Sequence, residues 1–161
     1  MFKVKKIHEK AILPTKSNSL DAGYDFYALD DVFLQPRSQS IIDTGIELVQ
    51  LPTPNMDGYW ETVMLIWPRS GMDARLAVTT GAGVIDTTYR GQILILLKNE
   101  SYDRVTIPYG KAIAQALIQP VWVGGMEVVD YSGESERGGK GGIAEARGGS
   151  LGFVYRDRTE V

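Results

Sequence analysis

The chain has 161 residues, of which 43% are hydrophobic and 23% are charged, so its length and composition suit one globular domain with its own core. Its 17 basic and 20 acidic residues give a formal net charge of −3, which argues against a dedicated nucleic-acid-binding protein because such surfaces need excess positive charge. It has no cysteine and one histidine, His8, which excludes disulfides, zinc–thiolate sites and clusters of histidine ligands within one chain.

The N-terminal stretch MFKVKKIHEK is charged, and no apolar segment of the kind found in secretory signals follows it. No apolar run in the sequence approaches the ~20 residues that a transmembrane helix needs. We therefore expect a soluble, cytoplasmic protein that contacts neither membrane nor nucleic acid. Because only one histidine is present, we expect any general base to be a carboxylate.

β-Strand patterns dominate the chain, and turn-rich stretches separate them at intervals typical of β-barrels and β-sandwiches. One helical turn is predicted, at residues 72–77. The run QILILL at residues 92–97 is apolar on both faces, which predicts a central strand that is covered on both sides. In chain order, the predicted strands lie at residues 2–5, 32–34, 40–48, 60–67, 92–97, 105–107 and 113–123.

Residues 132–152 differ from the rest of the chain because they are rich in glycine, with interspersed arginine and lysine. Such a stretch can bury little apolar surface. We therefore predict one β-domain at residues 1–131, followed by a flexible glycine-rich C-terminal arm at residues 132–161. Glycine backbone and guanidinium groups suit closure over a polyanion, and a disordered tail is the alternative.

Two segments in the first half of the chain place polar side chains next to turns. Asp25, in DAGYDFYA at residues 21–28, could hold a magnesium ion through water, or it could cap a turn. In PRSG at residues 68–71, backbone N–H groups and the Ser70 hydroxyl could bind an anion, with Arg69 as a phosphate or carboxylate partner. The alternative for Ser70 is an ordinary helix cap.

The segment GAGVIDTTYRG, at residues 81–91, lies between two predicted strands and is interpreted as a hairpin. Gly81 and Gly83 permit a ligand to approach the backbone closely. Asp86 follows two apolar residues, so we expect it to be partly buried and suited to deprotonating water, with an Asx turn as the alternative. Tyr89 could pack its ring against a sugar.

Two further segments complete the set. GKAIAQ, at residues 110–115, enters a predicted strand and ends in Gln115, which could orient a water molecule or a phosphate oxygen. SERGGKGG, at residues 135–142, belongs to the glycine-rich arm.

In their order and spacing, DAGYD, PRSG, GAGVIDTTYRG, GKAIAQ and SERGGKGG resemble the five motifs of the trimeric dUTP pyrophosphatase family. The third segment is the most specific of them. The resemblance implies an all-β, distorted jelly-roll-like β-barrel of the β-clip type with at most one short helix. It also implies a homotrimer with shared active sites that hydrolyses dUTP to dUMP and diphosphate with Mg²⁺, which lowers dUTP and supplies dUMP for dTTP synthesis.

The resemblance also implies roles for individual residues. Asp86 would activate the water that attacks the α-phosphorus, Tyr89 would pack on the deoxyribose, and Asp25 would hold the magnesium–triphosphate complex through water. The residues implied for base and sugar are Thr80, Gly83, Val84, Ile85, Asp86, Tyr89, Leu94 and Phe153. Those implied for the phosphates are Arg69, Ser70, Gly71, Gln115 and, from the arm of another subunit, Arg137.

The fourth motif and the arm depart from the family pattern. Ala112 stands where the family usually has arginine, and the neighbouring Lys111 is a candidate replacement. The family's arm carries a phenylalanine that stacks on uracil, whereas Ile143 follows the RGGKGG stretch that begins at Arg137 here. Phe153, which lies in imperfect register, is the alternative stacking ring.

Two alternatives to dUTP hydrolysis share this fold. A dCTP deaminase would carry a catalytic glutamate on the strand after the hairpin, where this chain has Leu96. A regulatory protein that senses dUTP would bind the nucleotide and a partner protein. Asp25, Asp86, Tyr89 and Gln115 together favour an enzyme over that regulatory protein.

Overall fold

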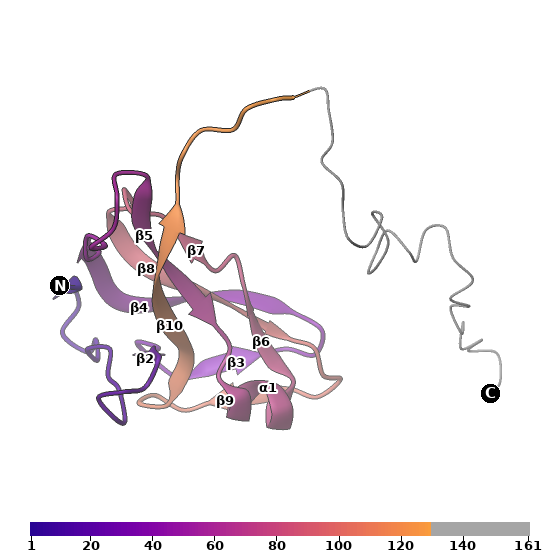
Figure 1. The fold of residues 1–161 in the computed structure, drawn as a ribbon. Helices are drawn as coiled ribbons and strands as arrows, with labels where there is room; N and C mark the ends of the chain where they lie inside the picture. Colours follow the sequence, from indigo (N-terminus) through magenta and orange to yellow (C-terminus); the bar gives the residue numbers. More distant parts are fainter. Residues whose placement is uncertain (130–161) are drawn as a thin grey trace, which may run out of the picture. The chain divides into compact units, whose positions relative to one another are not determined.

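The computed structural model describes residues 1–129, which form β-strands and one short helix (Figure 1). The all-β prediction is confirmed, and the helix begins at Ser70 rather than at residue 72. The compact unit spans Met1–Gly124, and the predicted arm lies outside the described residues. The elements are β1 (Lys3–Lys6), β2 (Gly23–Tyr27), β3 (Val32–Leu34), β4 (Gln39–Gln50), β5 (Trp60–Trp67), α1 (Ser70–Leu76), β6 (Val78–Gly81), β7 (Val84–Ile85), β8 (Gly91–Asn99), β9 (Val105–Ile107) and β10 (Ala112–Trp122).

Eight of the ten described strands form two four-stranded sheets, and every strand pair in them is antiparallel. One sheet has the order β1-β4-β8-β6 and the other has the order β2-β10-β5-β7, while β3 pairs with β9. Strands that are neighbours in a sheet are mostly distant in sequence. This arrangement is the jelly-roll-like β fold that the resemblance implied.

The core lies on the inner faces of the strands, as period-2 alternation requires. In β8, Ile93, Ile95 and Leu97 are fully buried, whereas the intervening Leu94 is 46% exposed. The prediction of a central strand is confirmed, because β8 lies between β4 and β6. The prediction that it is covered on both sides is wrong for the described chain, because Leu94 on its outer face stays 46% exposed among residues 1–129.

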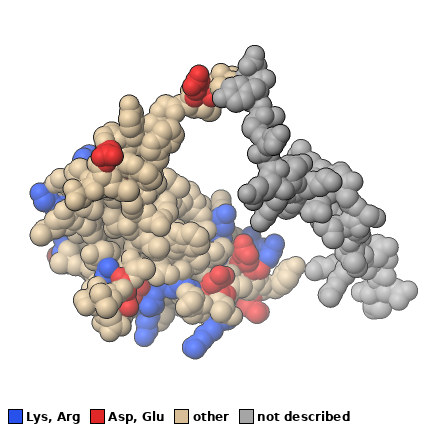
Figure 2. Space-filling view, in the orientation of Figure 1, with Lys and Arg blue, Asp and Glu red and all other residues tan. Residues whose placement is uncertain are grey.

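Figure 2 shows basic and acidic side chains next to one another on the face drawn, without a continuous basic stripe. No helix among residues 1–129 is long and apolar enough to cross a membrane.

Candidate active site

The sheet β2-β10-β5-β7 brings three of the five sequence segments together. In the register of this sheet, Gln115 of β10 pairs with Asp25 of β2 on one side and with Trp67 of β5 on the other. Trp67 is the residue immediately before PRSG. Strands β2, β10 and β5, from three distant parts of the sequence, therefore lie next to one another in this sheet (Figure 1).

These segments surround a cavity of about 510 Å³. The cavity contains every described residue that the sequence predicted for phosphate, together with the residue predicted for the metal. It also contains Arg75, which sequence reasoning missed, although Arg75 lies one helical turn after Gly71 and therefore on the same face of α1. The lining residues are Ser17, Asp21, Ala22, Gly23, Asp25, Arg69, Ser70, Gly71, Arg75 and Gln115.

An ion pair joins the first two segments across the cavity. Arg69 Nε lies 2.9 Å from Asp25 Oδ1, and the two side chains are 40% and 17% exposed. A pair this accessible to solvent contributes little to stability. Its consequence is electrostatic, because each side chain offsets the other's charge. With Asp21 and Arg75 included, the lining has two aspartates and two arginines, and its formal charge is balanced.

Gln115 connects the fourth segment to the second. Its Nε2 donates a hydrogen bond to the Pro68 carbonyl oxygen at 2.9 Å, which holds the end of β5 against β10. The side chain also lies directly over Gly23, where a Cβ would be 2.8 Å from Gln115 Oε1. A side chain at position 23 would therefore displace the Gln115 amide from this position.

The start of α1 rules out one alternative for Ser70. The N-cap residue is Arg69, which has extended backbone and no side-chain capping hydrogen bond. Its carbonyl oxygen accepts the first helical bonds, from the Met72 and Asp73 N–H groups at 2.9 and 3.0 Å. The alternative that Ser70 caps the helix is wrong, because Ser70 is already the first helical residue.

The third segment connects β6 to β8, which pair antiparallel as the predicted hairpin requires, while β7 within the segment pairs with β5 of the other sheet. Gly83 accepts a hydrogen bond from the Ile66 N–H at 2.7 Å, and a Cβ at Gly83 would lie 2.5 Å from the Ile66 carbonyl oxygen. Strand β5 of the same chain therefore lies very close to the backbone of Gly83. The close approach of a ligand at Gly81 and Gly83 stays a prediction.

Asp86 lies in the turn after β7, and this turn is closed by the Tyr89 N–H, which donates to the Asp86 carbonyl oxygen at 3.0 Å. Its side chain is exposed, so the predicted partial burial is wrong for the described chain. The physical reason is that β7 ends one residue earlier and no described element covers the turn. The Tyr89 hydroxyl donates to the Gln92 carbonyl oxygen at 2.6 Å, which holds the aromatic ring in place.

The residues predicted for base and sugar do not line the 510 Å³ cavity. Those that the structure describes lie on or beside the hairpin: Thr80, Gly83, Val84, Ile85, Asp86 and Tyr89, with Leu94 on β8. Arg137 and Phe153 lie outside the described residues. The described chain therefore brings the predicted phosphate and metal residues together, and presents the predicted base and sugar residues separately.

The dUTPase family model matches residues 9–145 of this sequence, which is most of the chain. The chain belongs to the dUTPase family. This membership agrees with the order of the five segments along the chain, and it favours dUTP hydrolysis over dCTP deamination.

Relatives of the dUTPase family match along most of their own length. The deoxyuridine 5'-triphosphate nucleotidohydrolase of Clostridioides difficile is 35% identical over 154 residues, covering 94% of this chain and 98% of that protein. The protein of the same name from Arabidopsis thaliana is 36% identical over 140 residues, covering 87% and 80%. The solved structure of the Staphylococcus bacteriophage 80alpha dUTPase with dUPNHPP is similar with a TM-score of 0.76 and 26% identity, covering 88% and 95%.

The donor groups of the cavity are compatible with a magnesium site in which water and substrate phosphates supply most of the ligands. Among residues 1–129, no group of three or more His, Asp or Glu side chains could hold a metal ion alone. The cavity offers the carboxylates of Asp21 and Asp25. Mg²⁺ commonly takes one or two carboxylates and keeps its remaining ligands as water and substrate phosphates. The residues present therefore fit a magnesium ion that arrives with a nucleotide.

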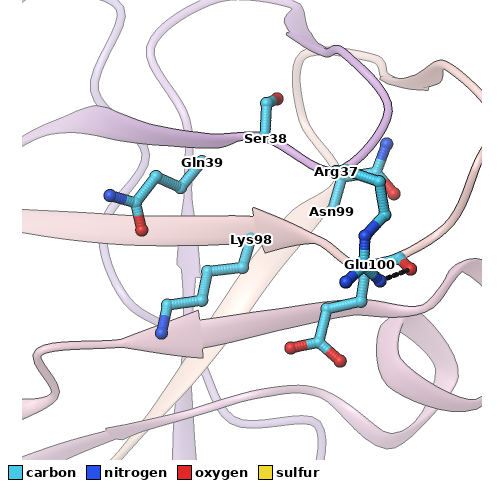
Figure 3. Close-up of a pocket in the computed structure, with 6 residues that line it drawn as sticks. All are labelled: Arg37, Ser38, Gln39, Lys98, Asn99 and Glu100. Atoms are coloured by element: carbon cyan, nitrogen blue, oxygen red, sulfur yellow. Dashed lines mark hydrogen bonds between the residues drawn. The ribbon is translucent and has the colours of Figure 1, made fainter.

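A second cavity, of about 210 Å³, lies where β4 begins and β8 ends (Figure 3). Its residues come from outside the five dUTPase segments, and Arg37 Nη1 already donates to the Glu100 carbonyl oxygen at 2.6 Å. We therefore assign the candidate site to the larger cavity. The residues of the smaller cavity are Arg37, Ser38, Gln39, Lys98, Asn99 and Glu100.

Replacing Gly83 with alanine is expected to destabilise the protein by ~1–3 kcal/mol, as overpacking typically does. The added Cβ would collide with the Ile66 carbonyl oxygen and push the hairpin away from β5. The free energy of unfolding in urea measures the effect. Gly58→Ala is the matched control, because no atom lies within 4 Å of a Cβ there. Equal losses for the two variants would contradict the close approach of β5.

Proposed function

We propose that this dUTPase-family chain hydrolyses dUTP to dUMP and diphosphate, with Asp86 activating the attacking water. The observation that carries the proposal is the cavity in which Asp25, Arg69, Ser70 and Gln115 meet from three separate segments. Hydroxyl, amide and guanidinium donors around one space suit a phosphate chain. The activity lowers dUTP and supplies dUMP for dTTP synthesis.

The balanced charge of the cavity supports a magnesium cofactor. A triphosphate carries several negative charges, whereas Arg69 is already paired with Asp25 and the lining has no net positive charge. Bound Mg²⁺ would supply the missing positive charge and neutralise charge on the phosphates. Asp25 would hold it through water, which would release Arg69 to bind phosphate. Arg137 of another subunit's arm would add a further cation.

Hydrolysis then requires a base and correct positioning. The Asp86 carboxylate takes a proton from water as the water oxygen attacks the α-phosphorus, and diphosphate leaves. Ser70, Gly71 and Gln115 orient the phosphates, so that the reaction proceeds by alignment and charge stabilisation without a covalent intermediate.

The hairpin would select the nucleotide. Backbone groups at Gly83, Val84 and Ile85 would bind uracil, with Thr80, Leu94 and Phe153 around the base. The Tyr89 ring, held by its bond to Gln92, would pack on deoxyribose and leave no room for a 2′-hydroxyl. A site that pairs with a substrate's polar groups rejects analogues lacking them, because its own groups are then left unpaired.

In a homotrimer with shared sites, the phosphate and metal residues of one chain would lie next to the base and sugar residues of another. The described chain by itself presents these two groups separately. On the outer face of the β1-β4-β8-β6 sheet, Ile41 pairs with Leu96, and Leu94 lies two residues before Leu96 on β8. Ile41 is 68% exposed and Leu94 is 46% exposed. Apolar side chains on an uncovered sheet face favour contact with another copy, which would bring the turn of Asp86 to a neighbour's cavity.

Changing Asp86 to asparagine is expected to lower diphosphate release from dUTP by about a hundredfold or more, because the amide cannot accept the water proton. The rate is measured with saturating dUTP and Mg²⁺. The melting temperature should not change, since the side chain is exposed. Asp57→Asn, at another exposed aspartate, is the control. Full activity of Asp86→Asn would rule out the proposed base.

Changing Asp25 to asparagine is expected to raise the Mg²⁺ concentration for half-maximal activity by about 10–100-fold, as loss of an outer-sphere ligand does. A Mg²⁺ titration of diphosphate release measures the shift. Asp73→Asn provides the control, because Asp73 lies on α1 but does not line the cavity. An unchanged Mg²⁺ requirement would remove Asp25 from the metal site.

Changing Ile41 to lysine is expected to reduce the mass in solution from three chains toward one, because it places a charge on the apolar outer face. Light scattering measures the mass, and dUTP hydrolysis should fall with it if the sites are shared. Tyr102→Lys is the control, since Tyr102 is 75% exposed in the loop after β8. A wild-type mass of one chain would contradict the homotrimer.

A further inference from the structure

The turn that carries Asp86 has few attachments to the rest of the chain. Strand β7, immediately before it, is only Val84–Ile85 and pairs with β5 through Leu65 and Met64. The Asp86 side chain itself is exposed. Its position therefore depends on how the backbone turn is held, and not on packing around the carboxylate.

One edge of β5 continues past the end of β7. The Ile66 N–H donates to Gly83, so the backbone groups of Ile66 point toward the hairpin. Alternate residues of a strand point their backbone groups to the same side, so Met64 and Thr62 do so as well. The partner strand ends at Ile85, opposite Met64. Thr62 therefore has no strand residue to pair with on this side.

Thr62 is only 3% exposed, so its carbonyl oxygen needs a donor within the protein. On the opposite side of β5, Thr62 lies across from Pro120 as a non-hydrogen-bonded pair, so its carbonyl group points away from β10. The donor is the Thr87 hydroxyl, whose Oγ1 lies 2.5 Å from the Thr62 carbonyl oxygen. This is the side-chain hydrogen bond that continues the β5–β7 ladder into the turn.

The same turn is tightened by one backbone hydrogen bond and one bond from a side chain of the turn itself. The Tyr89 N–H donates to the Asp86 carbonyl oxygen at 3.0 Å, and Arg90 Nη1 donates to the Thr87 carbonyl oxygen at 2.8 Å. Both bonds lie within the turn. The Thr87 hydroxyl differs from them because it ties the turn to a buried residue of another strand, directly beside the residue that carries the carboxylate.

We propose that Thr87 is a positioning residue for hydrolysis, because its hydroxyl bond to Thr62 sets the position of the neighbouring Asp86 carboxylate. This inference rests on the proposed role of Asp86 as the base. Without the hydroxyl, the buried Thr62 carbonyl loses its partner and the turn is free to move away from β5. The phosphate-binding residues lie on other segments and keep their contacts, and Gly83 keeps its bond to Ile66.

Valine has the same shape as threonine without the hydroxyl, and serine keeps the hydroxyl without the methyl group. Thr87→Val is expected to lower kcat by about 10–100-fold with little change in KM, as displacement of a reacting group by about 1 Å does. Thr87→Ser should restore kcat to within about threefold of the wild type. Thr88→Val is the matched control, at a neighbouring exposed threonine, and should have wild-type kcat.

The full chain is assayed for diphosphate release from dUTP with Mg²⁺, and each variant's melting temperature is measured alongside. If Thr87→Val does not fold, Thr87→Ala removes the hydroxyl without placing a methyl group against the Thr62 carbonyl. A folded valine or alanine variant with wild-type kcat would overturn the proposal. So would a serine variant as slow as the valine variant, because the hydroxyl would then not be the cause.

Asp86→Asn in the same assay separates this inference from the function on which it rests. If Asp86→Asn is inactive while Thr87→Val is fully active, only the positioning role is lost. If Asp86→Asn retains activity, the base assignment fails and the role of Thr87 fails with it.

Discussion

The antiparallel pairing of β10 with both β2 and β5 is the constraint on which the candidate site depends. It places Gln115 between Asp25 and the end of β5, and so determines which distant residues surround the cavity. Ala114 and Ala116, on either side of Gln115, are fully buried and hold this register. A slip by one residue would turn Gln115 into the core and an alanine into the cavity, which would cost both packing and the phosphate site.

At the same end of the sheet, the charged side chains of Arg69 and Asp25 are paired with each other, and a bound ligand could replace either partner. Arg69 and Asp25 offset one another while no nucleotide is bound, so neither charge is left uncompensated in a partly buried space. A triphosphate with its metal ion offers each of them a stronger partner of opposite sign. Binding would therefore replace one ion pair by two interactions, and would link phosphate binding to metal binding.

The hairpin that carries the residues proposed for base and sugar is held in a different way, through its backbone. Gly83 allows β5 to approach closely, and Thr87 extends that attachment past the end of β7, while the Asp86 side chain stays exposed. The backbone is held and the reactive group is left accessible. This exposure and the apolar outer face around Leu94 are what the proposed homotrimer with shared sites would use.

The sequence alone determined the family, seven of the ten strands and the identity of the chemical groups, because glycine positions, turn residues and period-2 alternation are local properties of the chain. It missed β2, β6 and β7, which are short. Asp25, Arg69 and Gln115 were named from such patterns. Only the tertiary structure decided that these three lie around one cavity, that β5 packs closely against Gly83, and that Asp86 is exposed. These features depend on pairing between strands far apart in sequence, and spacing within a single segment carries no information about which strand will become its neighbour.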